Sequence, residues 1–91
     1  MSDQMWCFQN AVFARWNGGI TVFGFAYKVS SGIESGTGHH TKLREAWHEG
    51  AYLYFQGNDG RTYQVVSRVE ADFTDATDAY ADVLRMAGSD A

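Results

Sequence analysis

Two turn signals divide the chain into similar halves and constrain its fold more than any other feature. They are Asn17-Gly18-Gly19 and Asn58-Asp59-Gly60, and aromatic-rich stretches flank each of them. Asn-Gly and Asp-Gly sequences tolerate the positive φ angles that tight hairpin turns require. The sequence therefore predicts two β-hairpins, over residues 5–29 and 51–71.

Pairing across a two-residue turn at Asn17-Gly18 gives the first hairpin one apolar face. In this register Trp6 lies opposite Val29, and Val12 lies opposite Phe23. Side chains alternate between the faces of a strand, so only this register gathers the large apolar side chains together. The predicted face consists of Trp6, Phe8, Val12, Phe23, Phe25, Tyr27 and Val29.

The second hairpin fits a three-residue loop with Gly60 in the left-handed conformation. Leu53 then pairs with Val65, and Phe55 pairs with Tyr63. One face is expected to hold Leu53, Phe55, Tyr63, Val65 and Val69, and the other Tyr52, Tyr54, Gln56, Thr62, Gln64 and Arg68.

Helical spacing of apolar residues follows each hairpin. Leu43, Ala46 and Trp47 recur at i, i+3 and i+4, and Gly50 can end a helix, so a short helix is predicted over 41–49. A longer C-terminal helix is predicted over 73–87, with Tyr80, Val83 and Leu84 in its buried stripe. Residues 30–40, rich in Ser and Gly, are expected to form a loop.

These elements predict one α+β domain over residues 1–91, with the order ββαββα. A four-stranded antiparallel sheet would carry a short and a longer helix on one face. The expected core is Trp6, Phe8, Val12, Phe23, Phe25, Leu53, Phe55, Val65, Val69, Tyr80, Val83 and Leu84.

Composition and charge narrow the class of protein. The net charge of −4 lies in residues 51–91, because residues 1–50 balance four basic with four acidic side chains. No basic footprint for duplex DNA is present in this pattern. Cys7 is the only cysteine, and neither a signal peptide nor a 20-residue apolar run occurs, so a cytoplasmic protein without membrane contact is expected.

Catalytic and metal chemistry are not indicated. His39 and His40 stand apart from His48, and Cys7, for which a histidine could act as base, lies in the middle of a predicted strand with no cationic helix end beside it. A zinc site needs ligands that converge, and a nucleophile needs a base within hydrogen-bond reach. We therefore expect no enzyme activity, no metal and no cofactor.

The Gly-rich segment 31–40 offers one candidate ligand site. It superficially resembles a phosphate-binding loop, but His39 follows its last glycine where that motif has a lysine. One hypothesis is therefore an oligomeric module that binds a small ligand or a nucleotide through this loop and exposed aromatic side chains. Its candidate ligand-binding residues are Ser35, Gly36, Thr37, Gly38, His39 and His40.

The leading hypothesis concerns a protein partner. Asp72, Asp75, Asp78 and Asp82 follow helical spacing along one side of the C-terminal helix, and Tyr52, Tyr54 and Arg68 share the sheet face opposite the predicted core. These residues predict a non-enzymatic protein that occludes a basic, nucleic-acid-binding surface of a larger protein. The exposed sheet face could instead be covered by a helix or by a second copy in a homodimer.

In its short length, acidity, aromatic content and scarcity of cysteine, the chain resembles small phage-encoded inhibitors of bacterial defence systems, anti-CRISPR proteins among them. The resemblance includes no shared motif. It implies inhibition by protein–protein interaction.

Overall fold

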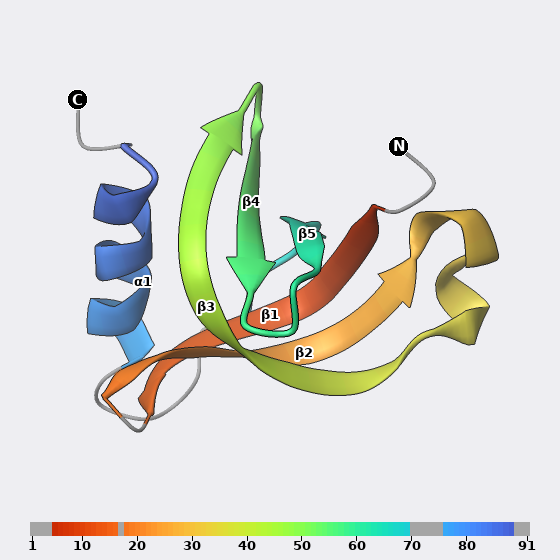
Figure 1. Cartoon of the computed structure of the whole chain (residues 1–91), viewed down its shortest axis with the longest axis horizontal. Coiled ribbons are helices and arrows are strands. Elements are labelled where there is room, and N and C mark those ends of the chain that lie inside the picture. Colours follow the sequence, from red (N-terminus) through yellow and green to blue (C-terminus); the bar gives the residue numbers. More distant parts are fainter. Residues whose placement is uncertain (1–4, 17, 70–75, 89–91) are drawn as a thin grey trace.

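A computed structural model describes residues 5–16, 18–69 and 76–88, which form a strongly curved sheet with a helix at one end (Figure 1). The strands are β1 (Trp6–Trp16), β2 (Gly19–Lys28), β3 (Thr37–Glu49), β4 (Tyr52–Gly57) and β5 (Thr62–Val65), and the helix is α1 (Ala76–Met86). Two single-turn 3₁₀ helices, η2 (Val29–Ser31) and η3 (Ile33–Ser35), connect β2 to β3.

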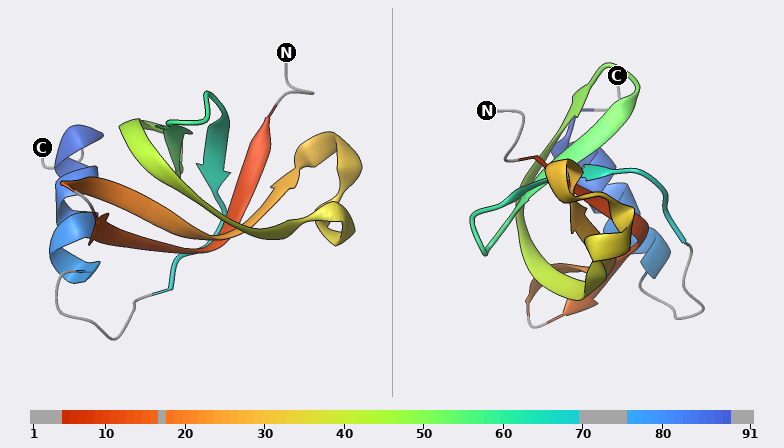
Figure 2. Two further views of the ribbon diagram at one scale, coloured as in Figure 1. Left: turned by 60° about the horizontal axis from the view of Figure 1, so that its bottom comes forward. Right: turned by 90° about the vertical axis from the view of Figure 1, so that its right-hand side faces the viewer.

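The five strands form a closed barrel. Each strand pairs antiparallel with the next along the chain, and β5 closes the sheet by pairing parallel with β1. The seam continues beyond β5, where the Val66 and Val69 amides donate to the Phe8 and Ala11 carbonyls, both at 2.9 Å. Helix α1 packs against β1 and β3 and covers one end of the barrel (Figure 2).

The α+β class is confirmed, but the described residues contain five strands and one helix rather than four strands and two helices. The predicted helix over 41–49 is wrong, because these residues belong to β3. The pairing register shifts by one residue between Leu43 and Glu45, which marks a β-bulge at Arg44. Leu43 and Ala46 are three residues apart and both enter the core. The bulge therefore produces an apolar spacing that resembles a helix.

The predicted loop over 30–40 is shorter than expected. It contains the two 3₁₀ turns, and β3 already begins at Thr37. A side chain at Gly36 would bring its Cβ within 2.4 Å of Phe25 Cε2, so glycine lets this turn lie on the Phe25 ring. Gly50, predicted to end a helix, has a φ of 62° in the turn between β3 and β4.

The register of the first hairpin is confirmed near its turn and wrong farther out. Val12 pairs with Phe23 as predicted, but Phe8 pairs with Ala26 because a bulge intervenes between Gln9 and Val12. Asn10, at the bulge, has a φ of 56°. The extra residue reverses the alternation, so Ala11 and Phe13 face the core after the bulge and Val12 does not.

The core therefore differs from the predicted one. Phe8, Leu53, Phe55 and Val83 are buried as expected, and Trp6, Val65 and Tyr80 pack against them. Val12, Phe23, Phe25 and Leu84 are only half-buried, and Val69 is exposed. Their places are taken by Ala11, Phe13, Ile20, Val22, Ala26, Leu43, Ala46, Tyr63 and Ala79.

The second hairpin has the predicted register throughout its described pairs. Leu53 lies opposite Val65 and Phe55 opposite Tyr63, and Gly60 has a φ of 85°. The predicted end of this hairpin at 70–71 and the predicted start of the C-terminal helix at 73 lie outside the described residues.

Candidate functional site

The outer surface of β3 and β4 carries aromatic and acidic side chains in directly opposed pairs. Glu49 pairs with Tyr52, Trp47 with Tyr54, and Glu45 with Gln56. Their neighbours Ala46, Leu53 and Phe55 are in the core, so strand alternation places these six side chains outside the barrel. We call Glu45, Trp47, Glu49, Tyr52, Tyr54 and Gln56 the acidic aromatic face.

Two aromatic side chains of this face, Trp47 and Tyr54, stack on each other. The Trp47 and Tyr54 rings are nearly parallel, at 8°, with centroids 6.2 Å apart. Tyr52 is 49% exposed, and both carboxylates of the face belong to exposed residues. The face therefore offers flat apolar rings between two negative charges, an arrangement suited to guanidinium or ammonium groups.

The predicted acidic stripe is engaged within the molecule where the structure describes its side chains. Asp82 forms ion pairs with Arg15, from β1, and with Arg85. The hydrogen bond from Arg15 is the main cause of the lowered pKa of Asp82. Asp72 and Asp75 lie outside the described residues, and Asp78 belongs to α1.

Arg68, the other predicted partner-binding residue, packs on the helix. Its guanidinium carbon lies 3.9 Å from the centre of the Tyr80 ring. This cation–π contact attaches the segment after β5 to α1. Arg68 therefore contributes to holding the helix against the barrel.

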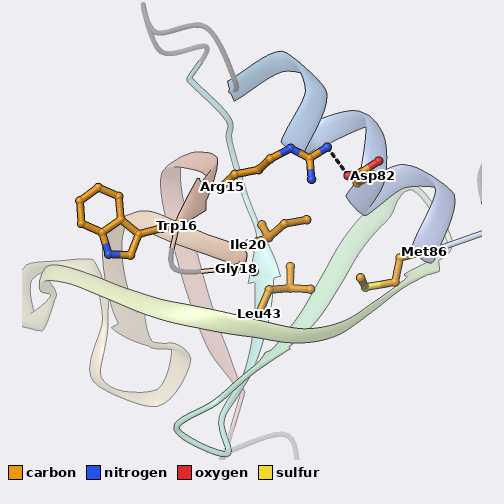
Figure 3. A pocket seen from close by; sticks show the side chains of 8 residues that line it. Arg15, Trp16, Gly18, Ile20, Leu43, Asp82 and Met86 are labelled. Carbon is orange, nitrogen blue, oxygen red and sulfur yellow. Dashed lines mark hydrogen bonds and ion pairs between the residues drawn. The ribbon is translucent and has the colours of Figure 1, made fainter.

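A hollow of ≈ 790 Å³ lies between α1 and the turn of the first hairpin. Figure 3 shows the Arg15–Asp82 ion pair at its edge and Ile20, Leu43 and Met86 along its apolar side. Because Arg15 is already paired, this hollow presents mainly apolar surface to a ligand.

His39, Asp59 and Tyr63 form a hydrogen-bonded cluster that joins β3 to the second hairpin. The Tyr63 hydroxyl donates to Asp59 Oδ2 at 2.6 Å, and His39 Nε2 lies 3.2 Å from the same oxygen. The Arg61 amide donates to Asp59 Oδ1 at 3.1 Å. This cluster anchors the turn beside the aromatic core.

Two pKa values follow from this cluster. Partial burial opposes ionisation of Asp59, but the hydrogen bonds from Tyr63, Arg61 and His39 outweigh it and lower the pKa. Burial and the hydrogen bond to Asp59 raise the pKa of Tyr63. Both shifts favour an ionised Asp59 that accepts from a neutral Tyr63.

The six predicted ligand-binding residues do not converge on one site. Ser35 donates through Oγ to the Gly32 carbonyl at 2.7 Å, and Gly36 lies under Phe25. Thr37 and Gly38 begin β3, where His39 and His40 are consecutive and so face opposite sides. The half-buried His39 ring lies near Phe8, with centroids 6.4 Å apart, and the His40 ring stacks on Phe23, with centroids 5.8 Å apart.

His40 instead belongs to a second hollow, on the outer surface of β2 and β3. This hollow has a volume of ≈ 500 Å³ and is lined by Trp16, Thr21, Phe23, His40 and Lys42. We call it the Trp16–Phe23 hollow. Sequence reasoning missed it because Phe23 was assigned to the core. His40 and Lys42 are exposed and the Thr41 between them is buried. This alternation is typical of a strand, and it would have placed His40 and Lys42 on the outer surface.

Trp47 was missed for a similar reason, since it was assigned to a helix.

Within the described part of the chain, no group of three or more His, Cys, Asp or Glu side chains is placed to hold a metal ion. Among the described residues, the helix α1 is too short and too polar to cross a bilayer. Comparison of the chain with family models, curated proteins and solved structures found no match.

Proposed function

We propose that this chain is a non-enzymatic binding protein whose acidic aromatic face covers a basic surface of a larger protein. The supporting observation is the paired arrangement of Glu49 with Tyr52 and Trp47 with Tyr54 on neighbouring strands. A partner Arg side chain can stack on an exposed ring while its guanidinium pairs with a flanking carboxylate. Basic protein surfaces of this kind commonly bind nucleic-acid phosphates, which the bound chain would exclude.

This proposal moves the contact from the helix to the barrel. Asp82 already binds two arginines of its own chain, so a partner would have to displace them. The carboxylates of Glu45 and Glu49 lie on exposed residues beside aromatic rings. The size and acidity of the chain fit a phage-encoded inhibitor of a bacterial defence system, of the anti-CRISPR kind, acting in the cytoplasm.

A homodimer through the same face is the competing arrangement. A two-fold contact would bring the Glu45 and Glu49 carboxylates of both copies together, which like-charge repulsion disfavours. Sedimentation of the purified chain tests this directly. A dimer that dissociates when Tyr52 is replaced by Ala would argue for self-association instead of a basic partner.

The proposed function can be tested by affinity capture with matched variants. The test variant combines Glu45→Gln, Glu49→Gln and Tyr52→Ala, and the control combines Ile33→Ala with Glu34→Gln on the exposed η3 turn. A protein captured by the parent and the control should be lost with the test variant. The same protein should release its nucleic acid when the chain is added.

Two results would contradict the proposal. The captured protein could bind the test variant as tightly as it binds the parent. It could also hold its nucleic acid and the chain at the same time, in which case the chain does not occlude that surface.

A further inference from the structure

Acidic residues are absent from the strands on one side of the barrel, although the chain as a whole is acidic. Residues 4–33, which include β1 and β2, contain no Asp or Glu. The part of β3 paired with β2, from Thr37 to Lys42, also lacks acidic residues. Lys42 lies on this surface, and Arg44 follows it at the bulge.

Aromatic rings lie on the same surface. Trp16 is 60% exposed at one side of the Trp16–Phe23 hollow. The Phe23 and His40 rings stack at an angle of 27° across β2 and β3, with centroids 5.8 Å apart. Phe25 points outward two residues beyond Phe23, opposite Gly38, which has no side chain. The Gly36 turn packs against the Phe25 ring, so the aromatic surface of the hollow consists of Trp16, Phe23 and His40.

Gly19 leaves room for the Lys42 side chain to lie over the first hairpin. An added Cβ at Gly19 would come within 2.6 Å of Lys42 Cε, so the lysine side chain crosses the space that a side chain at Gly19 would occupy. Lys42 pairs with Thr21 on the neighbouring strand. Thr21 is 5% exposed and lies at the base of the hollow. A cation is thereby placed beside the aromatic rings.

From this arrangement we propose that the Trp16–Phe23 hollow binds a nucleobase with its phosphate. The base would stack on Trp16 and on the Phe23–His40 pair, and the phosphate would pair with Lys42. Aromatic rings beside a cation are the usual elements of sequence-tolerant recognition of single strands. The volume of ≈ 500 Å³ lies in the range of small-ligand sites. A free nucleotide and a single-stranded nucleic acid present the same chemistry.

This site is separate from the acidic aromatic face. The hollow is lined by the end of β1, by β2 and by the first half of β3, whereas the acidic aromatic face uses the second half of β3 and β4. The variant with Glu45→Gln, Glu49→Gln and Tyr52→Ala should therefore bind nucleotides as the parent does. Failure of one proposal leaves the other to be judged on its own data.

The test is direct titration with defined probes at low salt. Adenosine monophosphate, uridine monophosphate and inorganic phosphate are followed by chemical shifts of the backbone amides, and a fluorescein-labelled 12-nucleotide thymidine strand by anisotropy. We expect shifts confined to Trp16, β2 and residues 37–44 with both nucleotides. Anisotropy should also rise, and the rise should weaken with added salt.

Four variants locate the ligand. Trp16→Ala and Lys42→Gln should each weaken nucleotide binding at least about tenfold. Gly19→Ala keeps the charge but displaces the lysine side chain, so binding should also fall. Lys28→Gln removes a charge from the far end of β2 and serves as the matched control, with binding unchanged.

The outcomes divide clearly. Binding of the strand at least about tenfold tighter than of the mononucleotides identifies single-stranded nucleic acid as the ligand, and equal binding identifies a free nucleotide. The proposal is overturned if neither probe binds at millimolar concentration. It is also overturned if inorganic phosphate binds as tightly as the nucleotides, or if Trp16→Ala and Lys42→Gln bind like the parent while remaining folded.

Discussion

Asn10 and Ser67 fasten the seam at which β1 meets the chain beyond β5. The Asn10 amide donates to Ser67 Oγ at 2.9 Å, and the Ser67 hydroxyl donates to Asn10 Oδ1 at 3.4 Å. Beside them, the Ala11 amide donates to the Ser67 carbonyl at 2.9 Å. The bulge that redirects β1 is therefore also the place where the barrel closes.

Replacing Asn10 tests this seam. Asn10 has a φ of 56°, a conformation that Asn tolerates better than Ala. Asn10→Ala should lower the free energy of unfolding by about 1–2 kcal/mol, as measured by urea denaturation. Asn10→Gly keeps the backbone conformation accessible and should lose less. Equal losses in both variants would show that the backbone conformation is not the cause.

Truncation of aromatic residues distinguishes the observed core from the predicted one. Phe55 is fully buried and stacks on Tyr63 with centroids 5.0 Å apart. Phe55→Ala should cost about 3–5 kcal/mol in denaturant unfolding. Phe23 is half-buried on the outer surface, so Phe23→Ala should cost at most about 1–2 kcal/mol. A larger loss at Phe23 than at Phe55 would contradict the inward and outward assignment.

Two strand glycines form a matched pair for testing the space around Phe8. An added Cβ at Gly24 would lie 2.4 Å from Phe8 Cε1 and 2.8 Å from the Gln9 carbonyl oxygen, whereas none of the described atoms lies within 4 Å at Gly38. Gly24→Ala should therefore destabilise the fold by about 1–3 kcal/mol. Gly38→Ala should have little effect on the thermal midpoint. Similar midpoints for both variants would mean that Phe8 does not occupy this space.

The Asp59 cluster predicts a dependence of stability on acid. The pKa of Asp59 in the folded protein lies below the usual 3.8, so the Asp59 carboxylate binds a proton more readily in the unfolded chain. The stabilisation is present above about pH 3.8 and is lost as the pH falls through the folded pKa. Asp59→Asn should cost about 1.5–3 kcal/mol at pH 7, since it removes hydrogen bonds to a charged group.

The measurement is denaturant unfolding of the parent and of Asp59→Asn between pH 7 and pH 2. The gap in unfolding free energy between the two proteins should narrow as the pH falls. Asp82 also has a lowered pKa, so the parent and the variant should share a further loss in acid. A gap that stays constant down to pH 2 would mean that Asp59 does not stabilise the fold through its charge.

Local sequence was sufficient for features that depend on neighbouring residues. The turn at Asn58-Asp59-Gly60 determined the pairing of β4 with β5, and no bulge interrupts the described pairs. Helical spacing around Tyr80 and Val83 likewise identified the C-terminal helix. In both elements the periodicity of the buried residues matches that of an undistorted strand or helix.

The sequence identified only some of the residues in the two candidate sites. Tyr52 and Tyr54 were recognised as outward-facing from the hairpin register, but the Trp47 that stacks on Tyr54 was assigned to a helix. Trp16 and Lys42 were not recognised as neighbours, because they belong to strands that meet only through β2. Both sites depend on contacts across strands that sequence spacing alone does not specify.

The bulges at Asn10 and Arg44 depend on tertiary structure, and they determine which side chains of β1 and β3 face inward. At Arg44 the extra residue puts Leu43 and Ala46 on one side, and at Asn10 it does the same for Phe8 and Ala11. Apolar residues three apart are typical of a helix when no partner strand is known. A bulge forms only where a distant strand supplies the hydrogen bonds, as the chain around Ser67 does for Asn10. The sequence determined the turns and the helix, and long-range pairing determined the barrel and its two faces.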